Sequence, residues 1–151
     1  MIKVRDMNIE EMQALIRRVG FGHLGCARDG RPYVVPMNYA YDSQDLYFFT
    51  TEGTKTEFIE ANPQVYLQVE EVADASRWQS VMVTGQAELV SLPAEMERAM
   101  QLLTARNPTL TPAINETRID AWGRPNNIRI YRLRPAVIDG RAATPDAAEP
   151  A

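Results

Sequence analysis

The stretch Asp-Gly-Arg-Pro-Tyr-Val-Val-Pro-Met-Asn-Tyr at residues 29–39 contains the strongest indication of the fold. Its Asp29-Gly30 pair is typical of the two-residue turn of a β-hairpin, in which both positions adopt positive φ. Residues 21–28 and 31–41 flank this turn, and we expect them to be the paired strands. Pro36 lies inside the second strand and has no N–H to donate, which predicts an edge strand, a bulge or the end of pairing there.

Further segments are rich in β-forming residues or alternate between apolar and polar side chains, which indicates strands at 46–50, 65–72, 79–90 and 127–138. Gly85 in the third of these predicts a bulge or a tight bend. Helices are expected at 8–19, within 51–62 and at 93–105. Six strands with peripheral helices predict a mainly β protein, for which a small closed antiparallel barrel fits best.

The first helix has the clearest boundaries. Apolar residues recur every three or four positions and form one stripe. Asn8 is the expected N-cap, with Glu11 at the N3 position of a capping box, and Gly20 is expected to end the helix.

The chain of 151 residues suits a single domain, which we place at residues 1–140. Segment 107–125 contains three prolines and has no regular pattern. Residues 141–151 are rich in alanine and proline, and we predict that they form a disordered tail.

Composition excludes several classes of protein. The net charge of −4 gives no general basic field for nucleic acid, and no apolar run is long enough to span a bilayer. With one histidine and one cysteine, His23 and Cys26, the chain cannot build a His/Cys zinc cluster, and no metal is expected. The first residues lack a signal-peptide core, so we expect a cytoplasmic protein.

Segment 49–56 is the best candidate for binding chemistry. A strand is followed by Gly53, and Thr54 and Lys55 open the next helix, with Thr54 as its expected cap. Amides at a helix start, hydroxyls and one ammonium together suit a phosphate monoester. The same residues also suit an ordinary helix start with a solvated lysine. The segment does not match a P-loop, and the chain has no Gly-x-Gly-x-x-Gly.

The order of several short motifs adds weight to the phosphate interpretation. Gly-x-Leu-Gly, the 29–39 stretch, Leu-Tyr-Phe-Phe-Thr-Thr, Thr-Lys, Asn-Pro-x-Val and Ser-Val-x-Val-x-Gly follow one another between residues 22 and 85. This series resembles the pyridoxamine 5′-phosphate oxidase-like, FMN-binding split-barrel superfamily, and is most similar to its small, nitroimidazole-resistance-type members. The resemblance covers residues 19–90 well and extends more weakly to residues 138–141.

The resemblance implies a six-stranded antiparallel split barrel and a homodimer with FMN bound at the subunit interface. It implies four groups of cofactor-binding residues, which contact the isoalloxazine, the ribityl chain, the phosphate, and the flavin of the partner subunit. These groups are, in that order, Pro36, Met37, Asn38 and Tyr39; Phe49, Thr50 and Thr51; Thr54 and Lys55; and Trp78, Gln79 and Ser80. Trp78 also suits a core position at the barrel end, and Tyr39 a cross-strand packing position.

The implied function is that of a flavin-dependent oxidoreductase with a small-molecule substrate. The catalytic residues are unknown, and Tyr39, Tyr41 and Arg124 are candidates for contacting the substrate. The chain lacks the Arg-x-Glu-x-Trp type of ending found in true pyridoxamine-phosphate oxidases, which argues against vitamin B6 oxidation. The superfamily also includes deazaflavin (F420) and haem binders. A non-catalytic flavin or haem carrier or sensor, with His23 as axial ligand, is therefore the alternative.

Overall fold

The computed structural model describes residues 2–106 and 128–145. In chain order the elements are β1 (Ile2–Asp6), α1 (Ile9–Val19), β2 (Phe21–Arg28), β3 (Arg31–Asn38), β4 (Ala40–Tyr41), β5 (Leu46–Thr51), α2 (Thr54–Ala61), β6 (Gln64–Asp74), β7 (Arg77–Leu89), α3 (Pro93–Arg106) and β8 (Ile128–Pro145). None of the described helices is long and apolar enough to span a membrane. Segment 107–125, with Arg124, lies outside the described residues.

The strands form one antiparallel sheet in the order β3-β2-β6-β7-β8-β5-β4, and β1 pairs with the far end of β8. Tyr39 alone separates β3 from β4, so the chain joins the two ends of this order although the two strands are not paired. The result is a barrel with a split, and the predicted mainly β, split-barrel class is confirmed. The described residues form eight strands where six were expected, because β1 was not predicted and the strand expected at 31–41 is divided at Tyr39 into β3 and β4.

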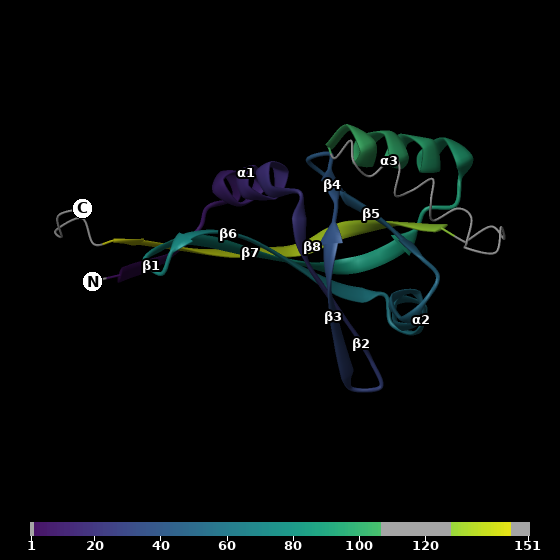
Figure 1. Cartoon of the computed structure of the whole chain (residues 1–151), viewed down its shortest axis with the longest axis horizontal. Coiled ribbons are helices and arrows are strands. Elements are labelled where there is room, and N and C mark those ends of the chain that lie inside the picture. Colours follow the sequence, from purple (N-terminus) through teal and green to yellow (C-terminus); the bar gives the residue numbers. More distant parts are fainter. Residues whose placement is uncertain (1, 107–127, 146–151) are drawn as a thin grey trace.

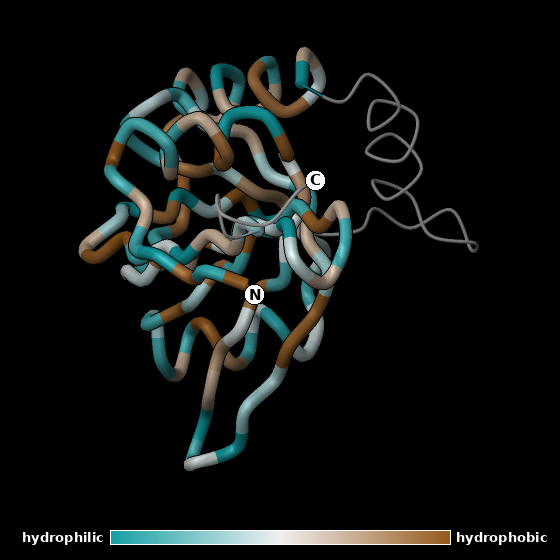
Figure 2. The backbone as a smooth tube through the Cα atoms, turned by 90° about the vertical axis from the view of Figure 1, so that its left-hand side faces the viewer, coloured by the Kyte–Doolittle hydropathy of each residue, from teal (hydrophilic) through white to brown (hydrophobic). Residues whose placement is uncertain are grey.

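The β2–β3 hairpin has the predicted form. Asp29 and Gly30 adopt φ values of 51° and 75°, as a two-residue hairpin turn requires. β3 is the first strand of the sheet order, so its outer edge has no strand partner, and Pro36 is tolerated there. The tip of this hairpin is hydrophilic and projects from the body of the molecule (Figure 2).

The predicted boundaries of α1 are also confirmed. The Asn8 side chain accepts a hydrogen bond from the Glu11 amide at 2.9 Å, the Glu11 carboxylate accepts one from the Asn8 amide, and Gly20 ends the helix with φ 71°. Leu15 and Ile16 of α1 are fully buried in the main core. Figure 1 shows α1 on one side of the long strands β6, β7 and β8.

β8 continues beyond the expected end of the folded domain. Residues 141–145 are a strand that pairs with β1 on one side and with β7 on the other. The predicted disorder is therefore wrong for these five residues, because β1, which the sequence analysis did not predict, supplies a pairing partner. Residues 146–151 lie outside the described part of the chain.

Gly85 marks the bulge that the sequence predicts. The register between β7 and β8 shifts between Thr84 and Gly85. A Cβ at Gly85 would lie 2.0 Å from the Arg134 carbonyl oxygen, so only glycine allows this close approach of the two strands. The bulge lies where the barrel passes into the long end of the sheet.

Candidate cofactor-binding site

The start of α2 differs from the prediction by one residue. Gly53 is the N-cap, and Thr54 is the first helical residue. The Thr56 hydroxyl accepts a hydrogen bond from the Gly53 amide at 2.9 Å and donates one to the Gly53 carbonyl at 2.8 Å. It thereby takes the capping role assigned to Thr54, whose side chain is exposed. The amides of Thr54 and Lys55 have no acceptor within the helix, so this end attracts an anion.

Lys55 lies at the same end of α2, close to β2. Burial raises the pKa of the Cys26 thiol in β2, and the nearby Lys55 ammonium opposes this rise. The Lys55 side chain is partly exposed and makes no ion pair within the described residues. An ammonium and two helix-terminal amides therefore lie together, and within the described residues the ammonium has no ion pair, although the exposed Glu57 lies in the same first turn of α2.

The strand before α2 contributes its last residues to this end. Thr50 is buried, and its hydroxyl donates to the Thr51 carbonyl at 3.2 Å, whereas the side chains of Phe49 and Thr51 are partly exposed. Glu52 forms an ion pair with Arg129 of β8. The structure thus places the predicted ribityl-contacting and phosphate-contacting residues in one continuous segment.

The residues predicted to contact the isoalloxazine point in different directions. Pro36 is exposed and Asn38 partly exposed, both on the outer face of β3, while Met37 is buried in the core. The Tyr39 side chain is 1% exposed; its hydroxyl donates to the Ile16 carbonyl at 2.6 Å and accepts from the Gly20 amide at 3.3 Å. Burial raises the pKa of Tyr39 to about 12.

The side chain of Tyr39 therefore holds the end of α1, which leaves only its backbone for contact with a ligand. Tyr41, the other tyrosine considered for substrate contact, lies half-buried under the Arg17 guanidinium, which is 5.8 Å from the ring centre. The Tyr39 hydroxyl is thus fully used within the fold, and the Tyr41 ring is partly covered by Arg17.

Trp78, Gln79 and Ser80 open β7 and alternate between the two faces of the sheet. Gln79 faces α1 and accepts a hydrogen bond from Arg18 at 3.3 Å. Trp78 and Ser80 face outward, and the Ser80 hydroxyl accepts from the Gln68 amide at 3.0 Å. The turn between β6 and β7 lies toward one end of the longest axis and α2 toward the other (Figure 1). One chain therefore does not bring Trp78 and Lys55 together.

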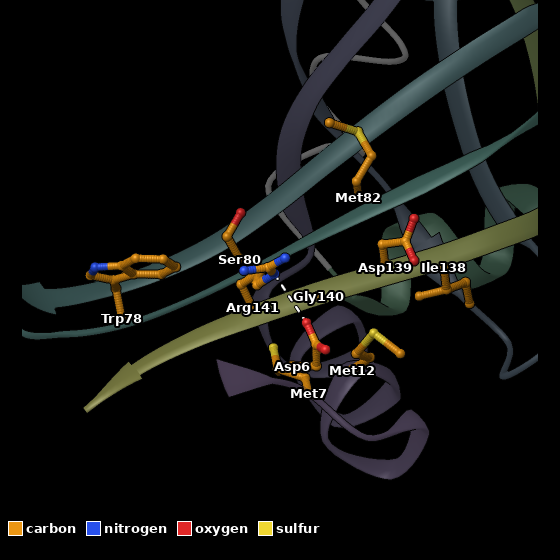
Figure 3. A pocket seen from close by; sticks show the side chains of 10 residues that line it. All are labelled: Asp6, Met7, Met12, Trp78, Ser80, Met82, Ile138, Asp139, Gly140 and Arg141. Carbon is orange, nitrogen blue, oxygen red and sulfur yellow. Dashed lines mark ion pairs between the residues drawn. The ribbon is translucent and has the colours of Figure 1, made fainter. Parts of the chain in front are cut away.

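An open cavity of about 800 Å³ adjoins Trp78, and its lining is the set of side chains drawn in Figure 3. Trp78, Ser80 and Met82 line it from β7, Met7 and Met12 line it near β8, and an Asp6–Arg141 ion pair of 3.0 Å crosses it. Of this lining, the resemblance implied only Trp78 and Ser80 as cofactor contacts. Met12, Met82 and Ile138 lie in a helix and in strands that the sequence predicts, whereas Asp6 and Arg141 come together through the pairing of β1 with residues 141–145, which it does not predict.

The outer face of the sheet, turned away from α1 and the core, is unusually apolar. Eight of the eleven exposed large hydrophobic side chains of the described residues lie on it: Ile2, Val4, Phe21, Val34, Tyr66, Val72, Met82 and Val137. His23 lies on the same face, with its ring edge-to-face against Phe21 at 5.9 Å. Exposed apolar side chains gathered on one face are typical of an interaction surface.

Comparison with known proteins identifies the family of the chain. The family model described as pyridoxamine 5′-phosphate oxidase matches residues 8–142. The chain belongs to this family. The resemblance found in the sequence is thereby confirmed.

Two solved structures have a similar fold and align with almost the whole of this chain. An FAD-binding protein from Mesorhizobium loti is 29% identical, with a TM-score of 0.78 over 96% of this chain and 100% of that one. The FAD-binding protein from Mycobacterium smegmatis is 22% identical, with a TM-score of 0.69 over 94% and 100% of the two chains, which shows a common fold.

A curated relative is an uncharacterised protein of Rhizobium meliloti (strain 1021), which is 41% identical over 91 residues. The match covers 60% of this chain and 59% of the relative, so it spans less than two thirds of the relative's length.

Proposed function

We propose that this chain is a flavin-dependent oxidoreductase that binds FMN between two copies of itself. The observation that carries the proposal is the start of α2, where Lys55, which has no ion pair within the described residues, lies beside the first amides of the helix. The 29%-identical structural relative is an FAD-binding protein, which supports a flavin as the ligand.

The residues of this end fit a flavin phosphate. Lys55 would form a charge-assisted hydrogen bond with it, and the Thr54 and Lys55 amides would donate to its oxygens. Thr51, which precedes the helix and is partly exposed, would contact the ribityl hydroxyls. The bound flavin would supply hydride or electron transfer, while the chain orients it and excludes water.

A homodimer is proposed because the groups suited to the phosphate and those suited to the flavin ring lie at opposite ends of one chain. The α2 end has the polar groups for a phosphate, and the distant Trp78 end has the partly exposed Trp78 ring and exposed apolar side chains such as Val72 and Met82. A second copy seated on the apolar outer face would cover that surface and bring its own Trp78 toward the first copy's flavin. Pro36 and Asn38 would then face the ring from the first copy.

The proposal is tested by titrating purified protein with FMN and with riboflavin. Lys55→Ala should weaken FMN binding about 10- to 150-fold, the effect of losing one charge-assisted hydrogen bond, and leave riboflavin binding nearly unchanged. The matched control is Lys3→Ala, since Lys3 is the chain's other lysine and lies on β1. A protein that is colourless and binds no added FMN would contradict the proposal.

A non-catalytic carrier or sensor is distinguished by what a bound flavin does. If the flavin is reduced and reoxidised in step with conversion of a small molecule, the chain is an enzyme. Haem binding is tested separately: a Soret band that His23→Ala abolishes would favour a haem protein, for which the exposed position of His23 leaves room.

A further inference from the structure

The cavity of Figure 3 has walls that suit an aromatic ring. Its apolar side chains are one indole, three thioethers and one branched alkyl group, contributed by Trp78, Met7, Met12, Met82 and Ile138. An indole stacks on a flat ring, and thioether sulfur makes favourable contacts with ring edges. Between these walls the cavity of about 800 Å³ is open to solvent, so a ligand can enter it.

The pairing of β7 with β8 sets the length of this cavity. Trp78, Ser80 and Met82 follow one another on the outer face of β7. Arg141 is the cross-strand neighbour of Ser80, and Asp139 is that of Met82, so their side chains lie on the same face. Trp78 and Asp139 are therefore four residues apart along the ladder, which is about 13 Å. A bicyclic ring stacked against Trp78 leaves room for a short alkyl arm that reaches Asp139.

The charged groups around the cavity favour a cation at the end of this arm. The Arg141 guanidinium is held by the Asp6 carboxylate at 3.0 Å. Asp139 is exposed and makes no ion pair within the described residues, and the same holds for Glu70, which lies opposite Ser80 on β6. Carboxylates thus outnumber cations in this part of the outer face, which attracts a positive group and repels an anion.

We infer that this cavity receives a planar aromatic molecule whose short alkyl arm ends in a protonated amine. The ring stacks on Trp78 and contacts the Met82 thioether, and the ammonium group donates to the Asp139 carboxylate. The inference rests on the proposed function for the role of this molecule as the substrate, because Trp78 is the residue that a second copy would bring toward the flavin. Anions such as phosphate esters are the class of molecule that the cavity disfavours.

The test is calorimetric titration of the full chain with three ligands that share an indole ring: tryptamine, tryptophol and indole-3-acetate. Tryptamine should bind about fivefold more tightly than tryptophol, the effect of one exposed ion pair, and indole-3-acetate should bind more weakly than either. Asp139→Asn should remove the preference for tryptamine and leave tryptophol affinity unchanged. Trp78→Leu keeps an apolar side chain but lacks the ring, and should weaken the binding of both.

The matched control is Asp29→Asn, which removes another exposed carboxylate, at the tip of the β2–β3 hairpin, and should change none of the three affinities. The titrations are repeated with protein saturated with FMN, and tryptamine should bind there as well.

Several results would overturn the inference and leave the proposed function intact. These are absence of tryptamine binding, equal affinity for the three ligands, a preference for indole-3-acetate, and competition between tryptamine and FMN, which would place the flavin itself in the cavity. A chain that binds tryptamine with the expected dependence on Asp139 but binds no FMN would support the ligand class of the cavity. It would overturn the proposed function and, with it, the role of the ligand as substrate.

Discussion

The two ends of the molecule leave different chemical groups without partners. One end holds α2, and the other holds the β6–β7 turn. At the α2 end the cations Lys55 and Arg31 make no ion pair within the described residues. At the other end Arg77 and Arg141 are paired with carboxylates, and it is apolar surface that is left uncovered.

This difference teaches that neither end is a complete site. Cations without an ion pair are suited to binding an anion, and an exposed apolar face is suited to packing against another protein surface. Because the two ends lie apart along the longest axis, one flavin can satisfy both only if the second end comes from another copy (Figure 1). The predictions below test whether the two ends act together or separately.

The largest effect is expected from a substitution far from α2. Met82→Glu places a carboxylate on the outer face beside Asp139, its cross-strand neighbour. In a dimer this charge would be buried without a partner, at a cost of several kcal/mol. The mass measured by light scattering should fall from twice 17.0 kDa to 17.0 kDa, and flavin affinity should fall about a hundredfold or more.

The control for this experiment is Leu92→Glu, which changes an equally apolar, exposed residue off the outer face. It should leave both the mass and the flavin affinity unchanged. A Met82→Glu monomer that binds FMN normally would show that the α2 end acts alone.

The next effect concerns the bulge that joins the two ends. Gly85→Ala forces a Cβ to within 2.0 Å of the Arg134 carbonyl, so backbone must move, and we expect a loss of about 3 kcal/mol in the free energy of unfolding. Gly25→Ala is the control, because its Cβ would have no neighbour nearer than 3.7 Å. Urea titration measures both. A Gly85→Ala protein as stable as the control would mean that the strands separate easily at this point.

Tyr39→Phe tests whether Tyr39, which the sequence predicts to contact the flavin, instead stabilises the C-terminal end of α1. Loss of its hydroxyl leaves the Ile16 carbonyl and the Gly20 amide without their partner, which should cost about 1–2 kcal/mol with little change in flavin affinity. A large loss of flavin affinity at unchanged stability would show that the Tyr39 side chain contacts the flavin.

The raised pKa of Tyr39 also predicts that the free energy of unfolding depends on pH. The folded-state pKa of about 12 lies above the ordinary value of 10.0, so the folded chain binds more protons than the unfolded chain between these values. Stability contributed by Tyr39 is therefore complete below pH 10 and is lost as the pH rises toward 12, by about 2–3 kcal/mol. Unfolding curves of wild type and Tyr39→Phe should converge over this range. Curves that stay parallel would contradict the assignment.

The smallest effect is expected at the cap of α1, which covers the inner face near the β6–β7 end. Asn8→Ala should cost about 1 kcal/mol, and Asn8→Gly only a few tenths, because glycine is an acceptable N-cap. Thermal unfolding measures the difference. Flavin affinity should be the same in all three proteins, and a change would show that α1 takes part in binding.

Local sequence patterns were sufficient to predict the elements whose contacts lie between residues close in sequence. The β2–β3 hairpin follows from Asp29-Gly30, and α1 follows from the reciprocal contacts of Asn8 and Glu11. The cap of α2 was misplaced by one residue because a threonine two positions further on supplies the hydroxyl. Such short-range competition between hydroxyls is not visible in a sequence.

Features that depend on distant pairings could not be predicted. Residues 141–145 look unstructured until β1 is placed beside them, and that pairing brings Asp6 and Arg141 together in the lining of the cavity of Figure 3. The opposition of Arg28 and Arg31 was implicit in the hairpin register, but the contact of the hairpin with the end of α2 depends on how α2 packs. The cofactor-binding residues thus stay predictions from the sequence, while their positions relative to one another come from the structure alone.

The pairing of β1 with the end of β8 has a consequence for the order of folding. Ile2 pairs with Pro145, so the first strand cannot take its place until the last described strand has been synthesised. Contacts between such distant residues require closure of a long loop and slow the search for the native fold. During synthesis the hairpin and α1 form from local contacts, whereas β1 remains without a partner until the ribosome has released residues 141–145. The part of the cavity wall that Asp6 and Arg141 form is therefore completed at the last stage of folding.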